Sequence, residues 1–167
     1  DWKISVEAYY QYLYDIPIKE DTNSTWTILN KNSGFVLSEL FNNGKAYNYG
    51  IELTARRSFS KQWYLLANAS LFESKYQNLD NVIRNTKYNN NFIYNLTAGK
   101  DFKIGKKRTD LIGTNCKVIW IGGRRGGPID IERSIIKGKT VYDSSQSNSL
   151  QMPHYFRFDV RFSYRKN

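Results

Sequence analysis

The sequence predicts an all-β fold: an antiparallel, up-and-down transmembrane β-barrel segment of about six strands, with long outer loops alternating with short periplasmic turns. Segments of about ten residues alternate apolar with polar side chains. A period of two is that of a β-strand, because its successive side chains point to opposite faces. The connections between the segments alternate long and short, and no apolar run approaches the roughly 18 to 20 residues that a membrane-spanning helix needs.

Each of the first three predicted strands has one face of apolar and aromatic side chains. In the first, residues 2–14, this face carries Trp2, Ile4, Val6, Ala8, Tyr10 and Tyr12. In the second, residues 47–57, it carries Tyr49, Ile51, Leu53 and Ala55. The third begins at residue 63 and continues with Leu65, Ala67, Ala69 and Leu71.

The last three predicted strands repeat the pattern. The fourth, residues 92–102, has Phe92, Tyr94, Leu96 and Ala98 on one face, and the fifth, residues 110–121, has Ile112, Cys116 and Val118. The sixth, residues 155–165, is the clearest, with one face made of Phe156, Phe158, Val160, Phe162 and Tyr164. Its other face is Arg157, Asp159, Arg161, Ser163 and Arg165. A helical period would mix the two sets, so we expect strands.

The predicted connections favour a membrane barrel over a soluble sheet. They cover residues 15–46, 58–62, 77–91, 103–109 and 122–154. Two structureless loops of about thirty residues are uncommon in a compact soluble domain, whereas outer-membrane barrels combine short periplasmic turns with long outer loops. Strands of about ten residues match the 9 to 11 that a tilted strand needs to cross a bilayer. Aromatic residues near the strand ends are typical of the two membrane interfaces.

The polar faces of these strands are expected to line a wet lumen. An arginine that faces lipid near the midplane costs about 2 to 4 kcal/mol, so a register with the charged face outward is disfavoured. The predicted lumen-facing residues are Glu7, Glu52, Arg56, Asn68, Asn95, Lys117, Arg157, Asp159 and Arg161. Six strands are too few to close around a polar lumen, since outer-membrane barrels begin at about eight. We therefore expect residues 1–167 to form part of a larger barrel, whose other strands lie outside them.

Several strand and turn phrases carry a family resemblance. They are residues 44–53 (GKAYNYGIEL), 63–65 (WYL), 74–76 (SKY), 84–89 (RNTKYN), 95–100 (NLTAGK), 122–125 (GGRR), 128–130 (PID) and 155–160 (YFRFDV). Together they resemble the barrel region of TonB-dependent outer-membrane receptors. The resemblance implies a 22-stranded barrel of the cell outer membrane. It further implies a plug domain that lies outside residues 1–167 and is pulled by a periplasmic TonB-type energising protein. It also implies uptake of a small nutrient ligand: an iron chelate, cobalamin, an oligosaccharide or a peptide.

Two loop segments supply candidate ligand contacts. The run from Gly122 to Pro128 could form an anion-binding backbone nest with Arg124 and Arg125, or it could be a flexible exit from the fifth strand. The loop around Trp26 mixes amides with aromatic rings, as a sugar-binding surface does, although ordinary polar surface loops look similar. Outer loops are where receptors meet their cargo, so we predict ligand contacts at Arg124, Arg125 and Trp26.

Other function classes fit the sequence less well. The net charge of +10 would suit a soluble β-protein that binds single-stranded nucleic acid, but rings and cations are segregated on opposite strand faces, so no nucleic-acid partner is expected. One histidine and no motif tying it to a nucleophile indicate no catalytic residues and no enzyme. The single cysteine, Cys116, stands among apolar residues, and neither a metal site nor a cofactor is predicted. A non-transporting outer-membrane barrel remains the main alternative, and lipid is the expected partner in both cases.

Overall fold

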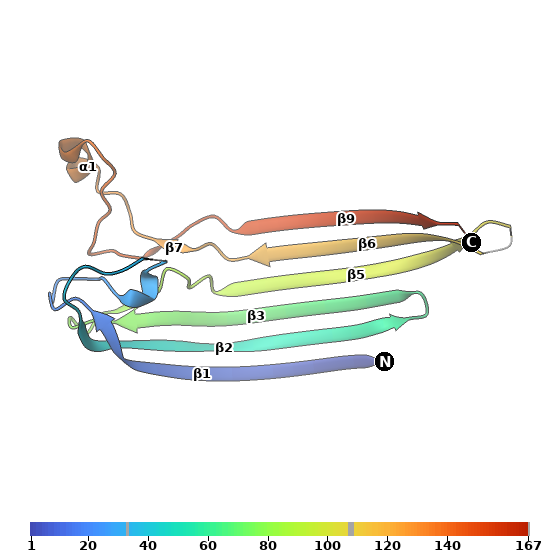
Figure 1. Cartoon of the computed structure of the whole chain (residues 1–167), viewed down its shortest axis with the longest axis horizontal. Helices are drawn as coiled ribbons and strands as arrows, with labels where there is room; N and C mark the ends of the chain where they lie inside the picture. The colour runs from blue at the N-terminus through green and yellow to red at the C-terminus, as the bar shows by residue number, and fades with distance from the viewer. Residues whose placement is uncertain (33, 107–108, 167) are drawn as a thin grey trace.

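The computed structural model describes residues 1–32, 34–106 and 109–166, and it consists mainly of one curved antiparallel sheet (Figure 1). The long strands are β1 (Trp2–Ile18), β2 (Phe41–Ser60), β3 (Trp63–Gln77), β5 (Phe92–Ile104), β6 (Asp110–Ile121) and β9 (Tyr155–Arg165). They lie side by side in the order β1-β2-β3-β5-β6-β9, each antiparallel to the next. The antiparallel all-β prediction is confirmed, and so is the up-and-down order.

The strand boundaries agree best in the second half of the chain. β6 and β9 coincide with the predicted ranges, whereas β1 and β2 extend further into the first long connection. Their pairing shifts register between Leu13 and Ile16 and again between Ile16 and Pro17, so bulges carry both strands past the point where the alternation stops. Pro17 is tolerated there because it lies at one of these irregularities.

The register keeps the two predicted faces apart across the whole sheet. One row of paired residues runs through Val6, Leu53, Ala69, Tyr94, Trp120 and Phe156. A row on the opposite side runs through Lys3, Arg56, Leu66, Thr97, Lys117 and Asp159. Paired residues share a side of the sheet, so we call the first side the apolar face and the second the polar face.

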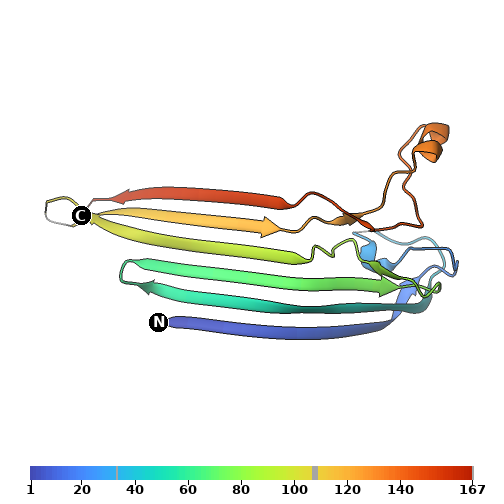
Figure 2. The same cartoon turned by 180° about the vertical axis from the view of Figure 1, so that it is seen from behind.

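The two ends of the sheet differ. At the turn end, where both termini also lie, β2 and β3 are joined by Lys61 and Gln62, both with positive φ (50° and 70°), the geometry of a type I′ hairpin turn (Figure 1). The predicted turn over 103–109 lies between β5 and β6, and its residues 107 and 108 are outside the described part of the chain. At the loop end, three connections gather, as the view from behind also shows (Figure 2). We call residues 19–32, 34–40, 78–91 and 122–154 together the loop cap.

The prediction that the long connections are structureless is wrong. The loop cap contains the 3-10 turn η1 (Ile28–Asn30), the strands β4 (Ile83–Asn85), β7 (Arg125–Gly126) and β8 (Leu150–Gln151), and the helix α1 (Ile131–Lys137). Asp130 caps α1 by accepting a hydrogen bond from the Arg133 backbone N–H at 2.9 Å, and Gly138 ends it in the left-handed conformation. Within the described residues, no helix is long and apolar enough to cross a membrane.

Candidate functional site: a two-faced sheet with a loop cap

The apolar face has aromatic residues at both ends and aliphatic residues between them. Its turn end carries Trp2, Trp63, Phe102, Phe162 and Tyr164, and its loop end carries Tyr10, Tyr12, Tyr47, Tyr49, Phe92, Tyr94, Trp120 and Phe156. Between them lie Ile4, Val6, Ala8, Ile51, Leu53, Ala55, Leu65, Ala67, Ala69, Leu71, Leu96, Ala98, Cys116, Val118, Phe158 and Val160. None of the described elements covers this face, and Val6 is 67% exposed.

The height of this apolar band matches a bilayer. Trp2 and Tyr12 are ten residues apart on β1, which at about 3.3 Å per residue is about 33 Å along the strand. A strand tilted by about 40° would then span about 25 Å, the height of the lipid-facing band of outer-membrane barrels. At the loop end, β3 places a charged pair among the aromatic residues of this face: Lys75, opposite Tyr47, forms a salt bridge of 3.4 Å with Glu73, opposite Tyr49.

The aromatic residues at each end contact one another. At the turn end the Trp2 and Trp63 rings meet edge to face at 5.9 Å, and the Arg57 guanidinium lies 3.9 Å from the Trp63 ring centre. At the loop end Phe92 contacts the rings of Trp120 at 5.0 Å and His154 at 5.1 Å. Rings with an apolar body and a polar edge suit the boundary between apolar and aqueous surroundings.

The polar face contains all nine residues predicted to face a lumen. Glu7 lies opposite Glu52, Asn68 opposite Asn95, and Lys117 opposite Asp159. Arg56, Arg157 and Arg161 share the same side of the sheet. Like charges directly opposite each other would be costly in a dry core, so the Glu7–Glu52 pair indicates a wet environment for this face.

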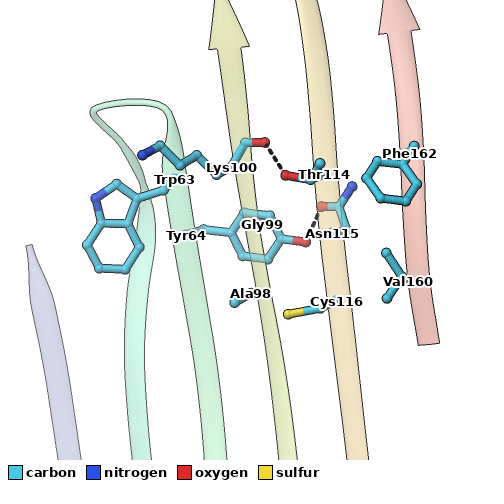
Figure 3. Close-up of a pocket in the computed structure, with 10 residues that line it drawn as sticks. All are labelled: Trp63, Tyr64, Ala98, Gly99, Lys100, Thr114, Asn115, Cys116, Val160 and Phe162. Carbon is cyan, nitrogen blue, oxygen red and sulfur yellow. Dashed lines mark hydrogen bonds between the residues drawn. The ribbon is translucent and has the colours of Figure 1, made fainter. Parts of the chain in front are cut away.

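Hydrogen bonds link the strands across this polar face. Ser70 donates to Glu52 at 3.2 Å, and Thr54 donates to Asn68 at 3.0 Å. Nearer the turn end, the Tyr64 hydroxyl donates to Asn115 Oδ1 at 2.8 Å, and its ring lies over Gly99 (Figure 3). A Cβ at Gly99 would lie 2.4 Å from the Tyr64 ring, so glycine is needed for this close approach. This contact joins residues on β3, β5 and β6, so no pattern within one strand could have predicted it.

Among the described residues, the buried side chains lie in the loop cap and in the strand segments beside it. The Tyr76 and Ala46 side chains are fully buried on the polar-face side of β3 and β2, against Ile28 and Leu29 of the first loop. The Tyr76 hydroxyl also donates to the Thr25 carbonyl at 2.8 Å. The first loop therefore folds over the polar face at the loop end of the sheet.

Asparagines bind the other two loops together. The buried Asn89 accepts from the Ser74 backbone N–H at 3.1 Å and donates to Glu73 at 2.8 Å and Asn85 at 2.9 Å. The Asn89 backbone carbonyl accepts from Arg125 Nε at 3.1 Å. Sequence reasoning treated residues 77–91 as an ordinary connection, because amide networks have no period that a sequence pattern could reveal.

The three predicted ligand contacts have different surroundings. Trp26 lines a hollow of about 870 Å³ between the first loop and residues 144–148. Arg124 is exposed, with its guanidinium 5.8 Å from the Tyr88 ring centre. Arg125 instead donates to Asn89 and Asn91 within the cap, so its guanidinium holds two loops together and does not converge with that of Arg124.

No protein-family model, curated protein or solved structure matches this chain. In the described part of the chain, no group of three or more histidine, cysteine or acidic residues is placed to hold a metal ion. The arrangement itself, a sheet with one apolar and one polar face beneath a polar cap, is therefore the main guide to function.

Proposed function

We propose that this chain forms part of the wall of an outer-membrane β-barrel, in a receptor for TonB-dependent uptake of a small nutrient. In this proposal the apolar face contacts lipid and the polar face lines the lumen. The loop cap lies outside the cell and the turn end faces the periplasm. A plug domain and a TonB-type energising protein are the expected partners.

The observation that carries the proposal is the apolar face. It extends across six strands, is bounded by aromatic residues at both ends, and has the height of a bilayer core. A soluble sheet with such a face would need a second layer to cover it, because contiguous exposed apolar patches on soluble monomers rarely exceed a few hundred Å².

The two edges of the sheet support a larger barrel. Among the described residues, β1 pairs only with β2 and β9 only with β6, so each leaves an unpaired edge. Unpaired backbone groups are not stable in lipid, and further strands would satisfy them. The offset between neighbouring strands also supports a larger barrel. Lys100 lies opposite Trp63, the first residue of β3, yet β5 continues to Ile104 before the chain turns. Tilted barrel strands require such an offset.

The loop cap supports a receptor, because it folds over the polar-face side at the loop end. Its hollow of about 870 Å³, lined by Trp26, lies within the size range of small-molecule sites. Trp26, Arg124 and Arg125 are the residues that we propose to contact the nutrient. Arg124 is exposed, whereas Arg125 also donates hydrogen bonds to Asn89 and Asn91.

Cell fractionation followed by nutrient uptake tests this proposal. The protein should fractionate with the outer membrane, need detergent to stay dispersed, and support uptake that stops when the energising protein is deleted. Fractionation with the outer membrane without any energised uptake would instead support a non-transporting barrel. A detergent-free, monodisperse product would contradict both and favour a soluble β-protein that binds single-stranded nucleic acid.

A further inference from the structure

We propose that the apolar face holds an anionic phospholipid at its turn end, with an acyl chain in a hollow on β5 and β6 and the phosphate at Lys100. This inference rests on the proposed function, because it requires the apolar face to lie in a bilayer.

The hollow interrupts the aromatic residues of the turn end. Trp63 on β3 and Phe162 on β9 form its sides, and between them β5 and β6 carry Lys100 and Thr114 (Figure 3). Toward the middle of the sheet its floor is made by the small side chains of Ala98 and Cys116. The recess has a volume of about 480 Å³, which is large enough for part of an acyl chain.

One cation lines this hollow, at its turn side. The Lys100 ammonium is 5.1 Å from the ring centre of Phe102, and it forms no salt bridge with a carboxylate among the described residues. Arg57 lies outside the hollow, on β2 beyond Trp63, in the row of Ala98 and Cys116. An unpaired cation beside an apolar recess complements a ligand that has an anionic head and an apolar tail.

The depth of the site fits a lipid better than a protein segment. The hollow lies at the level of Trp2, Trp63 and Tyr164, where a bilayer changes from headgroups to acyl chains. A basic residue near a membrane surface favours an anionic headgroup, by about fivefold for one lysine. We therefore commit to an anionic phospholipid, with phosphatidylglycerol as the probe.

Tryptophan quenching by brominated lipids tests this site. The full protein is placed in phosphatidylcholine vesicles that contain a small fraction of phosphatidylglycerol with brominated acyl chains. We expect this lipid to quench about fivefold more effectively than the same fraction of brominated phosphatidylcholine. Lys100→Gln should abolish the preference and Ala98→Leu, which fills the floor, should reduce it.

A matched control comes from the same strand. Lys103 lies on the polar face of β5, so Lys103→Gln removes the same charge and should leave the preference unchanged. Equal quenching by both brominated lipids, or a preference that survives Lys100→Gln, would overturn the lipid site while the membrane location stands. Absence of quenching by either lipid would overturn the membrane location itself, and the lipid site with it.

Discussion

Replacing Asn89 by alanine is expected to open the loop cap while the sheet stays folded. Asn89 is fully buried, and its side chain makes three hydrogen bonds, to the Ser74 backbone N–H, to Glu73 and to Asn85. Each partner left unsatisfied in a buried place costs about 1 to 3 kcal/mol. Glu73 keeps its hydrogen bond from Asn91 and is one-third exposed, so water offsets part of its loss. We therefore expect a total cost of about 2 to 4 kcal/mol.

Hydrogen exchange measures this cost residue by residue. The Ser74 and Thr86 amides, both bonded between β3 and the cap, should exchange about 30- to 1000-fold faster in the variant, the factor that corresponds to 2 to 4 kcal/mol. The Leu96 amide in the middle of β5 should keep its rate, because the sheet does not depend on the cap. Asn42→Ala, an exposed asparagine at the end of β2, is the matched control and should change neither. Unchanged exchange at Ser74 and Thr86 in the Asn89 variant would refute the reasoning.

Three further predictions concern the sheet, a turn and a loop. Val6→Arg places a charge in the middle of the apolar band and should destabilise the protein in lipid by about 2 to 4 kcal/mol in denaturant titrations. Lys61→Asn with Gln62→Gly should raise the free energy of unfolding by about 1 kcal/mol, since asparagine and glycine adopt positive φ more readily. The hydrogen bond from Arg84 lowers the pKa of the Asp80 carboxyl, so its stabilisation of about 1 kcal/mol is present above the ordinary aspartate pKa and is lost as pH falls through the lowered value. Exchange of the Val82 amide, which donates to Asp80, should therefore accelerate in acid.

Each of these three predictions has a control and a contradicting outcome. Ser5→Arg differs from Val6→Arg by one position and faces the polar side, so equal destabilisation by both would exclude a lipid-facing apolar band. A double turn variant that is less stable than the parent would mean that Lys61 and Gln62 make contacts that outweigh their backbone strain. Asp80→Asn should make exchange at Val82 independent of pH in the acid range, and a retained acid dependence would assign it to another group.

The sheet could be predicted well because the alternation of apolar and polar residues is visible within each strand. In β9 every second residue is apolar or aromatic, so its boundaries and its faces could be predicted from those residues alone. The pairing partners of such strands follow from the up-and-down order, which is why the rows through Val6 and through Lys3 have the expected composition. The extensions of β1 and β2 could not be predicted, since the bulges between Leu13 and Pro17 interrupt the alternation.

The loop cap was predicted poorly because its stability comes from contacts between distant residues. The helix α1 had a local signal that sequence analysis overlooked: Asp130 as a cap and Gly138 eight positions later as a stop. Asn89 had none, because a buried amide is recognisable only by its partners. For the same reason the sequence did not predict the hydrogen bonds that the Arg125 guanidinium donates to Asn89 and Asn91.

The central claim, that one face of the sheet meets lipid and the other meets water, is tested most directly by thiol labelling at two adjacent positions of β6. Cys116 is the only cysteine and lies on the apolar face, while Lys117 lies on the polar face. In native membranes, a small water-soluble thiol reagent should leave Cys116 unmodified and should react with a Lys117→Cys variant made in a Cys116→Ala background. Both thiols should react after denaturation. Reaction of native Cys116, or protection of both positions, would contradict the account.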